Sequence, residues 1–170
     1  MITIRKCAGV DVPVIIDIHD ALANGTEDAG FFLGPACADA MFSAVSSTGK
    51  LFLVAELDRS IGGYLLADTA WVPPDGGVLH PEFSPSIPHI HIQQVASVER
   101  GAGAHLYSHL IDEFGGHSLS AFVATHPKRN VRSARFHLKM GFSAVATFSA
   151  SSFAGIFGYQ STLFAMGERR

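Results

Sequence analysis

Residues 129–142, RNVRSARFHLKMGF, combine polar side chains at helical spacing with a dense set of positive charges. The basic side chains in and beside this segment are Lys128, Arg129, Arg132, Arg135 and Lys139. Arginine and lysine bind phosphate through charge-assisted hydrogen bonds, which need no net positive charge on the protein. The segment is therefore a candidate phosphate site, although a basic run alone commonly forms a solvated helix face. Asn130 is also a preferred N-cap, and Gly141 a preferred helix end.

A second candidate for phosphate chemistry is the stretch VERGAGA at residues 98–104. Gly101 and Gly103 lie between a predicted strand and a predicted helix, and neither carries a Cβ. Consecutive main-chain N–H groups can then face outward beside the positive end of the helix dipole, an arrangement that binds pyrophosphate. A lone Gly-x-Gly also occurs in ordinary strand-to-helix connections, so this turn indicates a pyrophosphate site only in combination with other motifs.

Two histidines at alternating positions of a predicted strand are the third group of residues that could ligate a metal ion or take part in catalysis. In the stretch HIHIQQVAS, His89 and His91 project to one face of the predicted strand, and Ile90 and Ile92 to the other. Alternate histidines can ligate a metal ion, but no third ligand stands at a motif spacing. No metal site is predicted, and a metal-dependent hydrolase is the most distant function considered.

The elements that must position these groups follow from the apolar periodicity and the turn residues. Helices are predicted at 11–22, where Asp11 caps and Pro13 lies in the first turn, and at 41–49, 101–114 and 130–141. Loops are predicted at 24–34, 71–88 and 149–158. Strands are predicted at 1–5, 51–56, 61–67, 89–96, 119–125, 142–148 and 159–166, with 51–56 and 61–67 as an antiparallel hairpin. This order predicts an α/β fold around one mixed sheet.

Composition limits the partners of the chain. The 170 residues, 48% of them apolar, predict one domain over residues 1–170. A formal net charge of −3 gives no overall reason to bind nucleic acid. Cys7 and Cys37 indicate neither a disulfide scaffold nor a metal site. No signal peptide or membrane-spanning stretch is visible, so we expect a cytoplasmic protein with no membrane partner.

Taken together, these motifs resemble the GNAT superfamily of N-acyltransferases. The specific part of the match is Asn130-x-x-Ser133-x-x-Phe136-His137-x-x-x-Gly141-Phe142, and the Gly-x-Gly turn after the fourth strand is the other part. The order of elements agrees over essentially the whole chain. The resemblance implies a mixed, mostly antiparallel sheet of about seven strands that is splayed between strands 4 and 5, with helices on both faces.

The resemblance also implies the donor, acetyl-CoA or another acyl-CoA, with its pantetheine arm in the splay. The residues that it implies for binding this carrier are Val95, Ala96, Arg100, Gly101, Ala102, Gly103, Ala104, Asn130, Ser133 and Phe136. The backbone N–H near Val95 would meet the tetrahedral oxyanion.

The glycine turn departs from the usual family pattern, in which Gln or Arg precedes two small residues. Placing Gly101 and Gly103 at the small positions puts Val98 where Gln or Arg is expected. The other register puts Arg100 there and His105 at the second glycine. The first register is preferred because it keeps the apolar face of the following helix in the family's phase.

His137 stands where many family members carry a tyrosine that protonates the leaving thiolate. An imidazole, with a reference pKa of ~6.5, can protonate a thiolate whose thiol has a pKa of ~8.5. His137 is therefore a candidate general acid. A partly buried histidine bonded to the backbone is the equally weighted alternative.

Acyl transfer to an amine also requires a proton acceptor, because an ammonium group with a pKa of ~10.4 stays protonated at neutral pH. The fourth strand carries no carboxylate, so we expect His89 or His91 to act as base, directly or through water. Glu99 and Asp68 are weaker candidates. The two histidines would otherwise simply line the splayed sheet.

The predicted function is transfer of an acetyl or short acyl group to a primary amine by direct attack. The alternative is a catalytically silent regulatory module that binds acyl-CoA. The amine acceptor, a small molecule or a peptide, would meet walls from Phe31, Phe32, Trp71, Phe83, Phe153 and Phe157, which suit an apolar or aromatic group. These aromatics would otherwise pack in the core or in a subunit interface, so a homodimer is left open.

Overall fold

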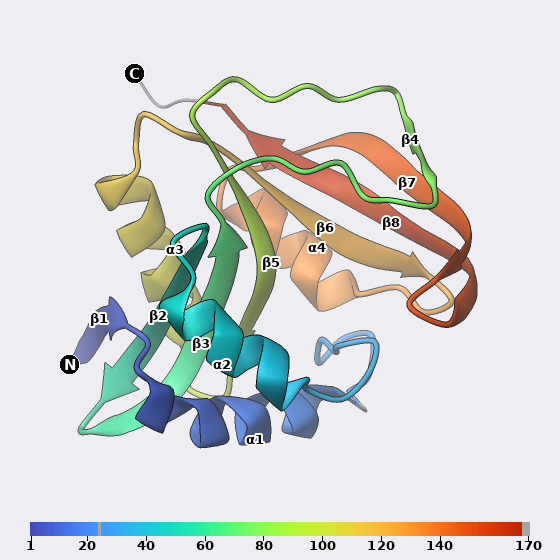
Figure 1. The fold of residues 1–170 in the computed structure, drawn as a ribbon. Helices are drawn as coiled ribbons and strands as arrows, with labels where there is room; N and C mark the ends of the chain where they lie inside the picture. Colours follow the sequence, from blue (N-terminus) through green and yellow to red (C-terminus); the bar gives the residue numbers. More distant parts are fainter. Residues whose placement is uncertain (24, 168–170) are drawn as a thin grey trace.

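The computed structural model describes residues 1–23 and 25–167, and its strands form one sheet in the order β1-β2-β3-β5-β6-β8-β7-β4 (Figure 1). The strands are β1 (Ile2–Lys6), β2 (Lys50–Leu57), β3 (Ser60–Asp68), β4 (Val78–His80), β5 (His89–Ser97), β6 (Ser118–His126), β7 (Ser143–Phe153) and β8 (Ile156–Met166). The helices are the short 3₁₀ turn η1 (Gly9–Asp11), α1 (Val12–Ala23), α2 (Ala38–Ser46), α3 (Ala102–Glu113) and α4 (Val131–Lys139). β5 and β6 pair in parallel, and the other neighbouring pairs are antiparallel.

Helices cover both faces of the sheet, as predicted (Figure 1). α3 and α4 pack on the face that buries Leu65 and Ile90. α1 and α2 pack on the opposite face, which buries Val54 and Tyr64. The alternation of apolar residues along β2 and β3 thus supplies two cores, one on each side of the sheet.

The β2–β3 hairpin is confirmed, with Asp58 and Arg59 at positive φ values of 49° and 69° in its turn. Positive φ at both central residues is typical of a two-residue turn whose twist matches that of the strands.

Two predictions along the chain are wrong. The segment 71–88 is not wholly irregular, because Val78–His80 forms β4 on the edge of β7, so the sheet has eight strands. Segment 149–158 is not a loop, because β7 runs to Phe153 and β8 begins at Ile156. Its small residues alternate between buried Ala150 and exposed serines, which is a strand pattern that the composition concealed.

The cap of α1 and the break that follows α1 are the two predicted features nearest the N-terminus. Asp11 does not cap α1 in the expected way: its carboxylate accepts from the N–H of Ala8 at 2.7 Å and from Arg5 at 2.7 and 2.9 Å. The predicted break over 24–34 begins at Asn24, which lies outside the described residues; residues 25–34 contain neither helix nor strand.

The splay is confirmed between the strands now named β5 and β6, since β4 adds one to the numbering. Their pairing runs from His89 opposite Ser118 to Ile92 opposite Ala121 and ends there. Beyond this point β5 stays paired with β3, and β6 stays paired with β8. A register shift at Gln93, between the pairs Ala67–Ile92 and Leu66–Gln94, marks where β5 turns away. The sheet therefore opens at residues 93–97.

Candidate active site

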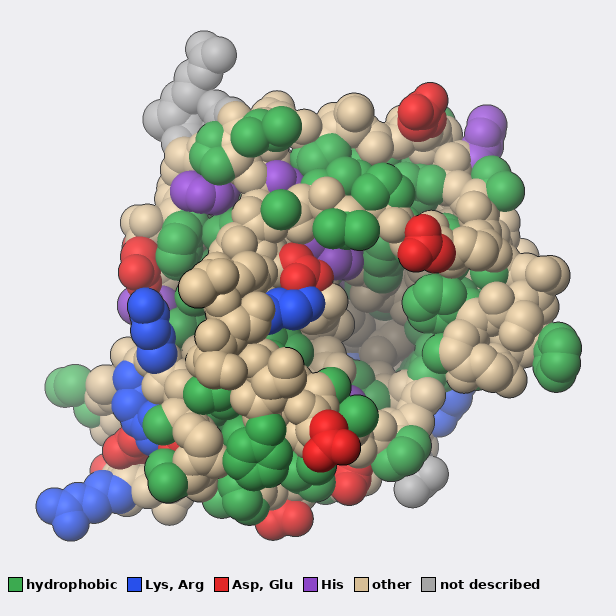
Figure 2. Space-filling view, viewed as in Figure 1, with side chains coloured by type: hydrophobic (Ala, Val, Ile, Leu, Met, Phe, Trp, Pro, Cys, Tyr) green, Lys and Arg blue, Asp and Glu red, His purple; other side chains and the backbone are tan. Residues whose placement is uncertain are grey.

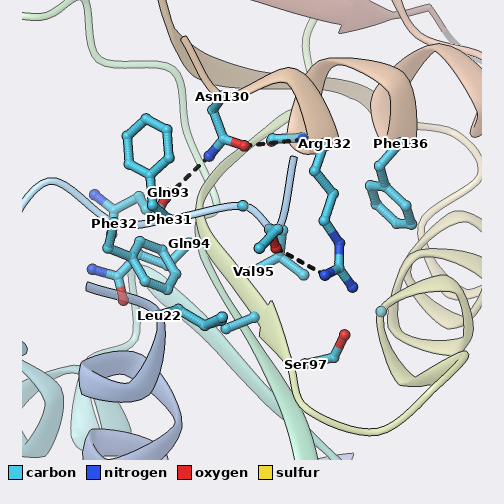
Figure 3. Close-up of a pocket in the computed structure, with 15 residues that line it drawn as sticks. Leu22, Phe31, Phe32, Gln93, Gln94, Val95, Ser97, Asn130, Arg132 and Phe136 are labelled. Carbon is cyan, nitrogen blue, oxygen red and sulfur yellow. Dashed lines mark hydrogen bonds between the residues drawn. The ribbon is translucent and has the colours of Figure 1, made fainter. Parts of the chain in front are cut away.

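The separated part of β5 forms one wall of a cavity of about 160 Å³ (Figure 3). The other walls come from α4, from the start of α3 and from the segment 29–32 between α1 and α2. Of the residues predicted to bind the carrier, the lining includes Val95, Ala96, Gly103, Asn130, Ser133 and Phe136. Figure 2 shows the molecule hollowed on the α1 and α2 side, at the place where β5 and β6 separate in Figure 1.

The glycine turn lies at one end of this cavity. Gly101 has a φ of +89° and precedes α3, so a glycine is needed there for a physical reason. Among the described residues, the N–H groups of Arg100, Gly101, Gly103 and Ala104 donate to no backbone oxygen. Four unpaired donors at a helix start form a natural anion site. Ala102 instead packs into the core, with 1% of its surface exposed.

Asn130 connects α4 to the opposite wall of the cavity (Figure 3). Its Oδ1 accepts from the N–H of Ser133 at 3.1 Å, which confirms the predicted N-cap. Its Nδ2 donates to the carbonyl oxygen of Phe31 at 3.0 Å. The side-chain amide thus holds the segment 29–32 in place beside the cavity.

The basic side chains of α4 meet the same segment of the chain. Arg132 Nη1 donates to the carbonyl of Ala29 at 2.8 Å, and Lys128 Nζ donates to the carbonyl of Gly25. Lys128 also lies 4.6 Å from the ring centre of Phe31. Arg132 lines the cavity, between Val95 and Phe136 in Figure 3, and keeps further N–H donors for an anion.

His137 lies in the core and is not among the cavity-lining residues. Its Nδ1 is 2.8 Å from the carbonyl of Ser133, which can only accept, so Nδ1 carries the proton. Its Nε2 accepts from the hydroxyl of Tyr107 at 2.7 Å. Burial lowers the pKa of His137, so the ring is neutral and both nitrogens are used. The structure shows the buried, backbone-bonded histidine and does not bring the predicted acid to the cavity.

His89 and His91 lie at the paired end of β5, just before the sheet opens. Both side chains hydrogen-bond to serines of β6 and contact the ring of Trp71, at 5.7 and 5.2 Å between ring centres. Of the weaker candidates, Asp68 pairs with Lys50 opposite His91, and Glu99 lies beyond the end of β5 against Gly62.

The predicted aromatic walls divide into three groups. Phe31 and Phe32 line the cavity. Trp71 and Phe83 pack together beside the two histidines of β5. Phe153 stacks on Tyr159 in the β7–β8 hairpin, and Phe157 is 82% exposed on β8; neither lines the cavity.

His19 is a residue beside the cavity that the sequence analysis did not single out. It is buried, stacks on Phe32 at 4.0 Å, and bonds to the Tyr64 hydroxyl at 2.8 Å. Tyr64 in turn bonds to Gln94, which lines the cavity. The signal was present in the sequence, because His19 follows Ile15 by one helical turn on the buried face of α1.

Across residues 1–23 and 25–167, no group of three or more His, Cys, Asp or Glu side chains is arranged to hold a metal ion. Within the same ranges, no helix has the length and apolarity to cross a membrane.

No family model matches this sequence, and no curated protein matches it. Solved structures do match over nearly the whole chain. The ribosomal-protein-S18-alanine N-acetyltransferase from Escherichia coli superposes with a TM-score of 0.70 at 15% identity, covering 100% of this chain and 96% of that one. The chain has the fold of the GNAT N-acetyltransferases.

Two further matches were solved with informative ligands. A putative acetyltransferase from Salmonella typhimurium, yncA, was solved with its cofactor acetyl-CoA; it has a TM-score of 0.70 at 20% identity and covers 100% and 95% of the two chains. NAA60 from Arabidopsis thaliana was solved with a bisubstrate analogue; it has a TM-score of 0.69 at 16% identity and covers 98% and 97%.

Proposed function

We propose that this protein transfers an acetyl or other short acyl group from acyl-CoA to a primary amine. The observation that carries this proposal is the cavity where β5 leaves β6, with unpaired N–H donors at one end and the aromatic side chains of Phe31, Phe32 and Phe136 in its walls. A thioester carrier needs an anion site joined to a narrow apolar passage, and this cavity supplies both. The solved neighbours with acetyl-CoA and with a bisubstrate analogue support the same assignment.

In this proposal the pyrophosphate of the carrier binds the unpaired N–H groups of Arg100, Gly101, Gly103 and Ala104, assisted by Arg132. The pantetheine arm then passes between β5 and α4, along Val95, Ser133 and Phe136. Residues 93–97 have no strand on the β6 side, so their main-chain groups on that side are available to the arm and to the acyl oxygen. The N–H near Val95 would stabilise the oxyanion.

The reaction is direct attack within one complex. The amine nitrogen forms a bond to the thioester carbon, and the electron pair of the C–S bond leaves on sulfur as that bond breaks. The protein supplies orientation, stabilisation of the oxyanion and an acceptor for the amine proton.

The test is release of free CoA from acetyl-CoA in the presence of a panel of primary amines, with the acylated amine identified by mass spectrometry. Apolar and aromatic amines are expected to react best, because Phe31 and Phe32 line the cavity. Calorimetric binding of acetyl-CoA without release of CoA for any amine would favour the silent binding module. Absence of binding would contradict both functions.

A further inference from the structure

Four side chains on the paired ends of β5 and β6 form one continuous chain of hydrogen bonds. His89 Nδ1 lies 2.7 Å from Ser118 Oγ, and His89 Nε2 lies 2.8 Å from Ser120 Oγ. Ser120 Oγ is also 2.8 Å from Nδ1 of His91. The chain follows from strand register, because His89 stands opposite Ser118 and His91 opposite Ser120. His89, Ser118 and Ser120 are buried.

The carbonyl oxygen at one end of this chain of hydrogen bonds determines which atom is the donor in each of them. Ser118 Oγ donates to the carbonyl oxygen of Ser86, which can only accept. The Ser118 oxygen must therefore accept from His89, so His89 carries its proton on Nδ1 when the ring is neutral.

The same assignment of donors and acceptors extends through Ser120 to His91. Neutral His89 has its lone pair on Nε2 and accepts the hydroxyl proton of Ser120. Ser120 has no second proton, so its oxygen accepts from Nδ1–H of His91. Burial lowers the pKa of both histidines to about 4, which agrees with neutral rings at physiological pH. The lone pair of His91 is therefore on Nε2.

The two histidines consequently differ in what they can do. Both ring nitrogens of His89 are occupied within the chain. Across the described residues, no group hydrogen-bonds to Nε2 of His91, and this atom is not sealed in the core. His91 as a whole is half-buried, against the rings of Trp71 and Phe122.

His91 does not itself line the cavity, but it precedes the lining residue Gln93 by two positions on β5 and is linked to it through side chains. Its partner across the sheet is Asp68, which pairs with Lys50, and Lys50 Nζ donates to Gln93 Oε1 at 3.1 Å. Gln93 lines the cavity. Figure 2 shows an acidic, a basic and a histidine side chain gathered beside the hollow.

We propose that His91 accepts the proton of the attacking amine, and that His89, Ser118 and Ser120 are positioning residues that fix its tautomer. This inference rests on the proposed acyl transfer. As the new C–N bond forms, the nitrogen of the tetrahedral adduct becomes positively charged and acidic. Its proton passes to Nε2 of His91 and then to water, while the thiolate leaves and takes a proton from water.

Charged groups around His91 set how well it holds this proton. Asp68 on β3 favours the imidazolium, whereas Lys50 on β2 and any charge on His89 oppose it. The ring therefore passes the proton on rather than keeping it.

The tautomer is tested directly in the free protein by nitrogen-15 NMR of labelled histidines. We expect a pyrrole-type Nδ1 and a pyridine-type Nε2 for His91, and a mixture of tautomers in Ser120→Ala. A protonated Nε2 on His91 in the wild-type protein would overturn the inference whatever the activity. This measurement does not depend on acyl transfer.

The role in catalysis is tested by kcat. His91→Gln should lower kcat by about 10²- to 10⁴-fold, the usual contribution of a general base, with desulfo-CoA affinity unchanged. Ser120→Ala, which keeps both rings, should lower kcat less. His109→Gln, on the exposed side of α3, is the matched control and should keep full activity.

The outcomes separate this inference from the proposed function. Wild-type turnover with unchanged kcat in a folded His91→Gln variant would overturn the role of His91 and leave acyl transfer standing. A wild-type protein that releases no CoA with any amine would overturn both.

Discussion

The side-chain amide of Asn130 donates from Nδ2 to the carbonyl of Phe31 at 3.0 Å, joining the start of α4 to a segment nearly a hundred residues earlier. The same amide caps α4 through Oδ1. One residue therefore has two separable tasks, to cap the start of α4 and to hold one wall of the cavity.

Asn130→Asp separates these tasks. The carboxylate can still cap α4, but it cannot donate to Phe31. We expect near wild-type stability in urea and faster amide hydrogen exchange over residues 29–32. Asn130→Ala should show the same faster exchange and also lose about 1 kcal/mol of unfolding free energy with the cap. Equal exchange in the Asp variant and the wild type would show that Phe31 is held by other contacts.

His137→Phe tests whether this histidine is structural. The change leaves the Tyr107 hydroxyl buried without its partner, which should lower the unfolding free energy by about 1–3 kcal/mol. The double variant with Tyr107→Phe should recover part of that loss, because no buried hydroxyl remains. Carrier affinity and kcat should stay close to wild type at temperatures where the variant is folded. A loss of kcat in a variant of unchanged stability would instead support His137 as the general acid.

Gly103→Leu tests the path of the carrier. An added Cβ at Gly103 meets Ser97 Oγ at 3.4 Å and the Phe136 ring at 3.9 Å, so Gly103→Ala should be tolerated. A leucine side chain would enter the cavity and should weaken CoA binding roughly 10-fold or more, since overpacking costs about 1–3 kcal/mol. Calorimetry on both variants provides the comparison. Wild-type affinity in the leucine variant would place the carrier elsewhere.

The unfolding free energy should decrease as the pH is lowered from about 6.5, where buried histidines rather than carboxylates control the change. Burial lowers the pKa of His89 and His91 to about 4 and also lowers the pKa of His19 and His137. The unfolded chain, with imidazole pKa values of ~6.5, then binds more protons than the folded chain below that pH. The unfolding free energy is therefore highest above about pH 6.5 and declines toward pH 4, which urea titrations at a series of pH values would measure. A flat profile over this range would contradict the burial of these rings in neutral form.

Features of the fold that depend on residues close together in the chain could be predicted from the sequence. The β2–β3 hairpin, the helix that follows Gly101 and the cap at Asn130 each depend on neighbouring residues, and each is confirmed. The splay followed from a resemblance rather than from periodicity.

The missed features depend on residues far apart in the chain. Ser118 and Ser120 meet His89 and His91 only because β5 and β6 pair in one particular register. The contacts of Lys128 and Arg132 with residues 25–29 join parts of the chain that no local pattern relates. The small, polar residues of 149–158 were read as a loop because β7 and β8 bury few large side chains there.

A crystal structure of the protein with bound desulfo-CoA tests the central claim most directly. We predict pyrophosphate oxygens within hydrogen-bonding distance of the unpaired N–H groups between Arg100 and Ala104, and the pantetheine arm between β5 and α4 with its end near Val95. A carrier bound outside the opening between β5 and β6, or a cavity that stays closed to it at saturating concentration, would contradict the account.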